Sequence, residues 1–264
     1  MKDIQNEFDS RGIDIQKVGI KNFSIPLNIR RKNSSNQVVN ANACMSVSLP
    51  KHYKGTHMSR FVEILNEWQT KDMLGSDLKG CVEAIVDKLS AVNGELVLSF
   101  EYFVKKIAPV SKYESVMPYE CTFKSVLSNY KSENENYKFT LGVKVPVLTL
   151  CPCSKEISEY GAHNQRAIVN VNVSYDRYEH IWIEDLIEVV EKCASNPVYP
   201  LLKREDEKFV TENAYNNPKF VEDVLRDVIV EFRENPIINE FEVECESMES
   251  IHNHSAWAYQ KEVK

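Results

Sequence analysis

Two cysteines that flank a proline, with one histidine a short distance beyond them, are the first residues of this chain whose types and spacing suggest chemistry. The segment reads TLCPCSKEISEYGAHNQR and contains Cys151, Cys153 and His163. A thiolate and an imidazole are good ligands for zinc, and they bind iron or manganese less selectively. Because Pro152 cannot continue a strand ladder, we expect the thiols at a strand end, where binding sites are commonly built.

A disulfide and a pair of structural cysteines are the alternatives to a metal site. Alternate residues of an extended chain point to opposite faces, which makes Cys151 and Cys153 poor disulfide partners. The seven cysteines are scattered and odd in number, which is not typical of a disulfide framework. A cysteine that only packs as a small hydrophobic residue stays an open reading.

A second cluster lies in the segment ESMESIHNHSA near the C-terminal end. It contains two of the six histidines and two glutamates, namely Glu246, Glu249, His252 and His254. In an extended segment His252 and His254 share one face. A carboxylate could orient a ligand there and an imidazole could transfer protons, while a polar surface turn is the alternative.

Two further segments carry local positive charge. The run LLKREDEKFVTENAYNNPKFVED mixes the basic residues Lys203, Arg204 and Lys208 with the carboxylates Glu205, Asp206, Glu207 and Glu212. Such a run is usually a solvated face, but a phosphate clamp beside a metal-ligating carboxylate has the same composition. The segment HYKGTHMSRF places His57 and Arg60 at a predicted helix start, where backbone N–H groups favour an anion.

Composition narrows the class of protein. The 264 residues are 43% hydrophobic and 27% charged, which is typical of a globular protein able to bury a sizeable core. The net charge of −7 argues against nucleic acid as the main partner but not against a small phosphorylated ligand. The first residues resemble neither a secretory signal nor a transit peptide, and the scattered cysteines indicate a reducing, cytoplasmic location.

The first half of the chain alternates between strand and helix patterns. Period-two alternation predicts a strand over residues 41–49, paired with residues 21–32 through the turn NSSNQ. Helical spacing predicts a helix capped by Ser59 and a second over residues 77–91. Strands are then expected over residues 95–104 and 119–127.

The same order recurs after the polar stretch at residues 129–138, which we take as an internal boundary. Two strands are expected, in KFTLGVKVPVLTL and AIVNVNVSYD, followed by a helix over residues 183–193. A second helix is expected to open at Asn217-Pro218, with the asparagine as its cap. Strands over residues 238–245 and 255–263 close the chain.

Each half therefore reads strand–strand–helix–helix–strand–strand, although the halves share no obvious sequence identity. The pattern predicts an α+β fold in which each half is an antiparallel sheet with two helices on one face. We expect an N-terminal extension at residues 1–16 and modules at residues 17–130 and 131–264, the second carrying most of the site. Open sheets have free edges, which invite closure by other subunits.

Four of these segments together resemble the type IB GTP cyclohydrolases. They are CPCSKEISEYGAHNQR, KGTHMSRF, LLKREDEKFVTENAYNNPKFVEDVLRD and ESIHNH, in that order along the chain. The resemblance implies a tunnelling fold with two tandem modules. It also implies a homotetramer with active sites between subunits, and a reaction in which GTP and water yield 7,8-dihydroneopterin triphosphate and formate as the first step of tetrahydrofolate synthesis.

The resemblance also implies roles for individual residues. Cys151 and His163 match the ligands of a divalent metal ion, which could be zinc, manganese or iron. A third ligand is expected from LKREDEK; Glu207 is our choice, although Glu205 stands where the family commonly has a proline and could also reach the metal.

The remaining assignments concern the substrate. Glu249 matches the residue that anchors the guanine edge, and His252 and Glu222 match the proton-transfer groups, with Cys153 assisting. The candidates for the triphosphate are Lys203, Arg204, Lys208, His57 and Arg60. The roles of His254 and Glu246 stay open.

Three other functions are alternatives for a chain with these residues. A nitrile reductase of the same fold is disfavoured because its characteristic lysine- and serine-containing stretch is missing and nothing suggests a dinucleotide site. These motifs distinguish poorly between a type IB enzyme and an archaeal-type cyclohydrolase, which yields a cyclic phosphate product. A non-catalytic metal-binding or pterin-binding protein is the third alternative, and metal-dependent formate release from GTP would exclude it.

Overall fold

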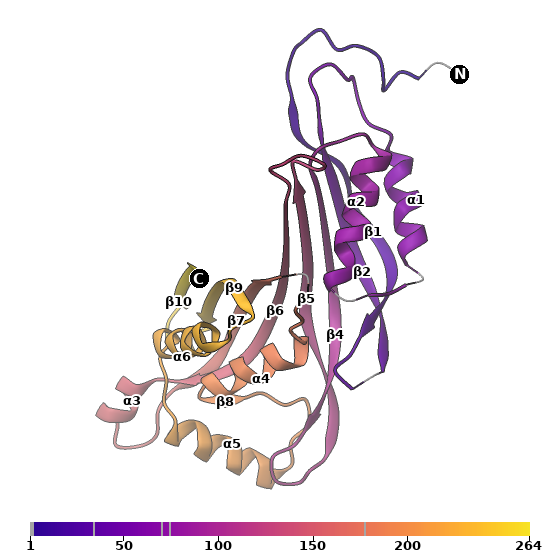
Figure 1. Ribbon diagram of the computed structural model, residues 1–264. Helices are drawn as coiled ribbons and strands as arrows, with labels where there is room; N and C mark the ends of the chain where they lie inside the picture. Colours follow the sequence, from indigo (N-terminus) through magenta and orange to yellow (C-terminus); the bar gives the residue numbers. More distant parts are fainter. Residues whose placement is uncertain (1–2, 34, 70, 74, 177) are drawn as a thin grey trace. The chain divides into compact units, whose positions relative to one another are not determined.

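The chain folds into two compact units whose residues interleave along the sequence. A computed structural model describes residues 3–33, 35–69, 71–73, 75–176 and 178–264 (Figure 1). The first unit comprises Met1–Glu101, Thr122–Leu141 and Tyr175–His180. The second comprises Tyr102–Cys121, Gly142–Ser174 and Ile181–Lys264. Three long strands, β4, β5 and β6, contribute residues to both units.

The first unit is a sheet with helices packed against it. Its elements are β1 (Ile15–Arg30), β2 (Asn36–Leu49), α1 (Met58–Trp68), β3 (Asp72–Met73), η1 (Gly75–Asp77), α2 (Leu78–Lys88) and the starts of β4 (Gly94–Ile107) and β6 (Asn136–Leu150) with the end of β5 (Glu114–Ser128). Strands β1, β2 and β4 pair antiparallel, and β3 adds to β1 in parallel. The predicted alternation in β2 is confirmed, since Ala43 and Met45 are fully buried.

Helices α1 and α2 lie side by side over this sheet (Figure 1). Helix α1 buries Phe61, Ile64 and Leu65, which are residues of the predicted apolar face. The close approach of α2 to the sheet requires a glycine at position 94. A Cβ atom there would lie 2.5 Å from a methyl group of Val86.

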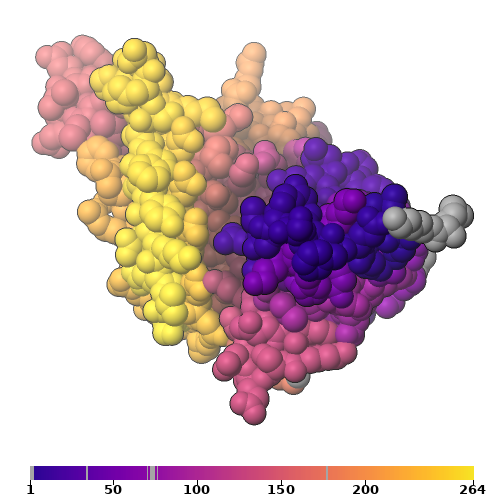
Figure 2. Space-filling view, turned by 90° about the horizontal axis from the view of Figure 1, so that it is seen from above, coloured from indigo at the N-terminus to yellow at the C-terminus, as the bar shows by residue number. Residues whose placement is uncertain are grey.

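The second unit carries the rest of the chain. Its further elements are α3 (Pro152–Ile157), β7 (Asn164–Tyr175), α4 (Ile183–Cys193), β8 (Asn196–Pro197), α5 (Arg204–Asn216), α6 (Val221–Glu234), β9 (Ile238–Ser247) and β10 (Ala256–Val263). The strand order is β10-β9-β7-β6-β5, with β10 as an edge strand whose residues lie at the surface (yellow in Figure 2). Helix α6 packs on β9, β10 and α4, and the rings of Phe232 and Phe241 meet at 5.6 Å.

Polar groups also hold α4 to the strands. The hydroxyl of Tyr102 donates a hydrogen bond to Glu184 at 2.6 Å, and the hydroxyl of Tyr119 donates one to Glu191 at 2.9 Å. Lys106 forms an ion pair with the same Glu191. Burial, assisted by the charge of Glu191, raises the pKa of Tyr119, so this phenol stays protonated and acts as a donor.

The predicted element order is confirmed, with three local corrections. Helix α1 begins at Met58, so Ser59 lies in its first turn and is not the cap. Helix α6 begins at Val221 and not at Asn217-Pro218. Asn217 is not its cap, because its side-chain amide donates to the carbonyl groups of Ala194 and Ser195. Helices α3 and α5 were not predicted, because one is very short and the other was read as a charged run.

The predicted boundary near residue 130 falls in the turn between β5 and β6. Because both strands supply residues to both compact units, the contacts do not divide the chain at that turn. The division into modules at 17–130 and 131–264 therefore stays a prediction. No helix in the described part of the chain is long and apolar enough to cross a membrane.

The start of α5 is anchored by one buried carboxylate. Asp206 accepts hydrogen bonds from the amides of Val110 (2.8 Å), Ser111 (2.9 Å) and Lys203 (2.8 Å) and from the hydroxyl of Ser111 (2.6 Å). Burial opposes ionisation of this group, but the hydrogen bonds from Ser111, Lys203 and Val110 outweigh it. They hold the pKa of Asp206 well below its ordinary value of 3.8.

We predict that Asp206→Asn lowers the melting temperature, because it removes an ionised acceptor of four hydrogen bonds. Since the folded pKa is depressed, the stability difference from wild type is full above pH 3.8 and shrinks as the pH falls below that value. Thermal unfolding followed by circular dichroism between pH 3 and pH 8 measures this. The control is Glu212→Gln on the exposed part of the same helix, and an equal change in both variants would contradict the prediction.

Candidate functional site

A pocket of about 260 Å³ in the second unit gathers side chains from four separate segments. They come from the end of β6 and the start of α3, the start of β7, the start of α6, and the end of β9 with the residues after it. Its lining residues are Thr149, Cys151, His163, Gln165, Lys219, Phe220, Val221, Glu222, Ser247, Glu249, His252, His254 and Ala256.

The chain turns sharply where β6 ends. Pro152 is the first residue of α3 and Cys151 is its N-cap, so the thiol lies at a strand end, as predicted. The amide of Cys151 donates to the carbonyl of His163 at 3.1 Å. The hydroxyl of Ser154 donates to the carbonyl of Cys151 (3.2 Å) and accepts from the amide of His163 (3.1 Å), which ties the two segments together.

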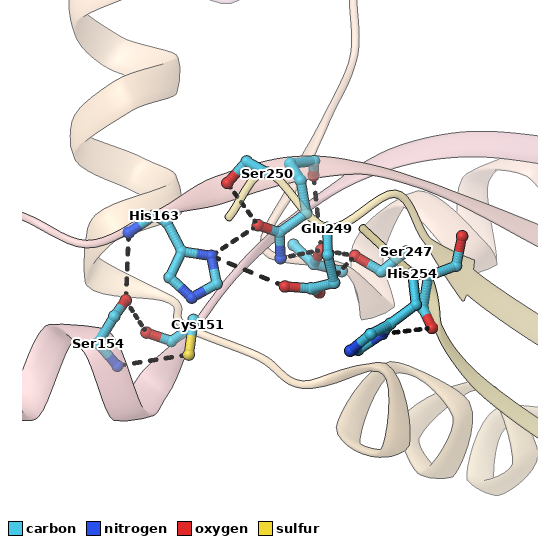
Figure 3. Close-up of polar contacts among 10 residues, drawn as sticks. Cys151, Ser154, His163, Ser247, Glu249, Ser250 and His254 are labelled. Carbon is cyan, nitrogen blue, oxygen red and sulfur yellow. Dashed lines mark hydrogen bonds and ion pairs between the residues drawn. The ribbon is translucent and has the colours of Figure 1, made fainter. Parts of the chain in front are cut away.

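The two predicted ligands are neighbours in the pocket lining (Figure 3). The sulfur of Cys151 accepts a hydrogen bond from the amide of Ser154 at 3.3 Å. The Nδ1 atom of His163 lies 2.9 Å from Oε1 of Gln165 and 3.9 Å from a carboxylate oxygen of Glu249. The other ring nitrogen, Nε2, is turned toward the sulfur of Cys151 (Figure 3). The pocket lining thus contains one sulfur and one imidazole nitrogen donor from two adjoining segments.

The predicted third ligand is not in this pocket. Glu207 and Glu205 are both exposed on the first turn of α5 and do not line it. Helix α5 meets α3 at its other end, where the ammonium group of Lys155 donates to the carbonyl of Tyr215. Glu207 lies eight residues earlier, which is about 12 Å along a helix. Among the described residues no group of three or more histidine, cysteine, aspartate or glutamate side chains is placed to hold a metal ion.

Glu249 lies inside the pocket. Its side chain is 11% exposed, and one carboxylate oxygen accepts a hydrogen bond from the hydroxyl of Ser247 at 3.4 Å. His252 and His254 are exposed at the rim, with their rings stacked at 5.1 Å, so they share one face as expected. Glu222 is exposed in the first turn of α6 and also lines the pocket.

The other predicted residues lie elsewhere. Cys153 is exposed on α3 and is not part of the lining. Lys203, Arg204 and Lys208 are exposed at the start of α5, with Lys203 over the ring of Tyr113. His57 and Arg60 belong to the first unit, and the guanidinium of Arg60 donates to the carbonyl of Lys88 at 2.9 Å.

Sequence reasoning missed several lining residues, notably Gln165, Thr149 and Lys219. Gln165 had a detectable signal, since it follows His163 by two positions and alternate residues of an extended segment share a face. Lys219 binds the carbonyl of Cys193 (2.9 Å) and the carboxylate of Asp227 (2.6 Å), contacts that no local pattern indicates.

All seven cysteines are free thiols, which removes the disulfide alternative. Burial raises the pKa of Cys81 and Cys245 to about 12 and that of Cys193 to about 11. These three residues match the structural reading of a cysteine. Cys151 is half-buried in the pocket and does not match it.

Comparison with known proteins gives the family of this chain. The family described as "Type I GTP cyclohydrolase folE2" matches residues 1–258. The chain belongs to this family. A GTP cyclohydrolase FolE2 of Citrifermentans bemidjiense is 52% identical over 258 residues, covering 98% of this chain and 93% of that protein. The GTP cyclohydrolase FolE2 of Thermosipho africanus is 48% identical, covering 98% and 96%.

Solved structures with a similar fold are uricases. Uricase from Arthrobacter globiformis matches with a TM-score of 0.56 at 7% identity, covering 94% of this chain and 93% of that one. Urate oxidase from Bacillus sp. TB-90 gives 0.56 at 9% identity, covering 95% and 100%. At this identity the likeness concerns the fold alone, and it confirms the predicted α+β tunnelling fold of this chain.

We predict that Ser154→Ala loosens the junction between the two ligand segments. Loss of both hydroxyl bonds should lower the free energy of unfolding by about 1–3 kcal/mol, at roughly 1 kcal/mol for each bond. It should also speed amide hydrogen exchange at His163. The control is Ser158→Ala, whose hydroxyl bonds only to the main chain of exposed Tyr160, donating to its carbonyl and accepting from its amide. Unchanged exchange at His163 in the Ser154 variant would refute this role.

Proposed function

We propose that the pocket around Cys151, His163 and Glu249 is the active site of this GTP cyclohydrolase. The protein is an enzyme that converts GTP to dihydroneopterin triphosphate in folate biosynthesis. The observation that supports this location is that Cys151, His163 and the largely buried carboxylate of Glu249 line one pocket. This activity is preferred to the archaeal-type reaction and to a non-catalytic binding role.

A divalent metal ion (Zn, Mn or Fe) fits the donors that are present. The sulfur of Cys151 and Nε2 of His163 would hold it, and a sulfur and nitrogen pair with a carboxylate is intermediate in softness. When bound, such an ion lowers the pKa of a water molecule and so supplies hydroxide near neutral pH. Glu207 remains the proposed third ligand, with Glu205 the alternative.

Glu249 is proposed to hold the guanine. A carboxylate can accept both the ring N–H and the exocyclic amine in a bidentate pair, which also sets the orientation of C8. The hydrogen bond from Ser247 holds one oxygen of this carboxylate in place. Glu249 thereby orients the base and does not need to take part in proton transfer.

Proton transfer is proposed for His252 and Glu222, which line the same pocket. Attack of water on C8 and opening of the imidazole ring require a proton at the departing ring nitrogen, and release of formate requires another at the amine. An imidazole and a carboxylate at the rim can exchange protons with both the substrate and solvent. Cys153, exposed on α3 two residues after Cys151, is proposed as an assisting group.

We propose a cytoplasmic homotetramer with active sites at subunit interfaces and two tandem modules in each chain. Exposed Trp257 and Tyr259 on edge strand β10 support assembly, because a free edge with aromatic side chains favours pairing with another chain. The five proposed triphosphate ligands Lys203, Arg204, Lys208, His57 and Arg60 lie outside the pocket lining, as does Glu207. Assembly would determine which chain supplies them to each site.

We predict that Cys151→Ala lowers turnover by more than about 100-fold while leaving the fold intact, because a ligand is worth more than its orienting partner. The assay incubates enzyme and GTP with single divalent ions under reducing conditions, and measures formate and the fluorescence of the oxidised pterin. Glu207→Gln should also lose bound metal and turnover, and Glu205→Gln is its matched control. Normal rates in metal-stripped wild-type enzyme would refute the metal assignment.

We predict that Glu249→Ala weakens GTP binding by about 10- to 100-fold, since a charge-assisted hydrogen-bond pair contributes roughly 1.5–3 kcal/mol. Inosine triphosphate, which lacks the exocyclic amine, should bind less well than GTP to wild type but equally to the variant. Isothermal titration measures both affinities. Undiminished preference for GTP in the variant would show that another group reads the base.

A further inference from the structure

Gln165 lies directly behind His163. Neither the sequence analysis nor the proposed reaction gives this glutamine a role. Gln165 is 9% exposed and lines the pocket. Its Oε1 atom lies 2.9 Å from Nδ1 of His163 and accepts a weak hydrogen bond from the hydroxyl of Ser250 at 3.4 Å. Its Nε2 group donates to Oγ1 of Thr149 at 3.3 Å. Both ends of the amide therefore have partners (Figure 3).

The partners of Gln165 define which way its amide faces. The hydroxyl of Thr149 lies 3.0 Å from the hydroxyl of Ser247 and 3.5 Å from the main-chain carbonyl of Gln165, and its oxygen accepts from Nε2 of Gln165. Oε1 is then left facing His163. A carbonyl oxygen can only accept, so the proton of the neutral imidazole must lie on Nδ1.

Glu249 also favours a proton on Nδ1 of His163. Its carboxylate oxygen is 3.9 Å from Nδ1, and a carboxylate beside a ring nitrogen favours a proton on that nitrogen. Two acceptors thus face Nδ1, and Nε2 keeps its lone pair on the side of the Cys151 sulfur (Figure 3). An imidazole binds a metal ion through its unprotonated nitrogen.

We propose that Gln165 is a positioning residue that holds His163 as the Nδ1–H tautomer and aims Nε2 at the sulfur of Cys151. The inference rests on the metal site proposed above for this pocket. Thr149 is part of the device, because it keeps the amide from turning over. Gln165 itself touches neither metal nor substrate.

The test compares Gln165→Leu, which removes the acceptor, with Gln165→Glu, which keeps one. The control is Ser250→Ala, which removes the other partner of the same oxygen atom. Cobalt(II) serves as the probe, and its thiolate charge-transfer band is titrated on metal-stripped protein. Long-range ¹H–¹⁵N correlation spectra of the metal-free proteins report the ring tautomer, at a pH well above about 6.5 so that a histidine is neutral.

We expect Gln165→Leu to weaken cobalt binding by about 10- to 100-fold, the usual effect of losing an orienting partner, with the same band at saturation. Its His163 ring should show a mixture of tautomers. Gln165→Glu and Ser250→Ala should keep the Nδ1–H form and bind cobalt within a few-fold of wild type. A merely structural glutamine would change stability and leave the tautomer alone.

Two results would overturn the inference: wild-type cobalt affinity in Gln165→Leu, or a single Nδ1–H tautomer in that variant. If Gln165→Leu does not fold, Thr149→Val replaces it, since freeing the amide to turn should also mix the tautomers, and an unmixed ring would overturn the inference equally. If wild type binds no cobalt, the metal proposal fails by itself. The tautomer spectra of metal-free protein then still decide the role of Gln165.

Discussion

The hydrogen bond from the amide of Cys151 to the carbonyl of His163 fixes the two proposed ligand segments of the pocket next to each other. It joins the end of β6 to the segment that starts β7, and the amide of Lys219 binds the carbonyl of Leu150 one residue earlier. Three segments distant in sequence thus meet within two residues of one strand end. Pro152 allows this turn at little cost, because a residue at the first position of a helix needs no N–H.

A consequence is that rigid backbone, rather than mobile side chains, positions the reactive groups. Cys151 caps a helix, Glu222 opens another, and His163 immediately precedes a strand. Buried hydroxyl groups of Thr149 and Ser247, 3.0 Å apart, fill the floor beneath them. Because these hydroxyl groups are uncharged, the charged and ionisable groups of the pocket remain available to the substrate.

Much of the fold could be predicted from the sequence because its signals are local. The alternation that ends at Leu49 and the apolar face of α6 each follow from the period of one element. Cys151 and His163 could be paired because they belong to one continuous segment. Helix α5 was missed because its run of carboxylates is also typical of a solvated surface, and Asp206 shows why the run is there. One of its carboxylates is buried as an anchor, while its neighbours are exposed.

Contacts between distant residues could not be predicted. Gln165 meets Thr149 and Ser250 only after three strands have formed, and its place two positions after His163 does not indicate these partners. The position of Glu207 relative to the pocket could not be predicted for a different reason. The family resemblance assigns it a role, but a role shared among segments, or among chains, depends on geometry that no single stretch of sequence contains.

The seven thiols differ in burial and therefore in their access to reagents. Cys81, Cys193 and Cys245 remain protonated at neutral pH and are closed to solvent, so an alkylating reagent reaches them only after unfolding. Cys153 is open to the reagent in the native protein. Alkylation of the native protein would therefore be limited to Cys153 and, more slowly, the half-buried Cys44 and Cys151, without any engineered removal of those three cysteines.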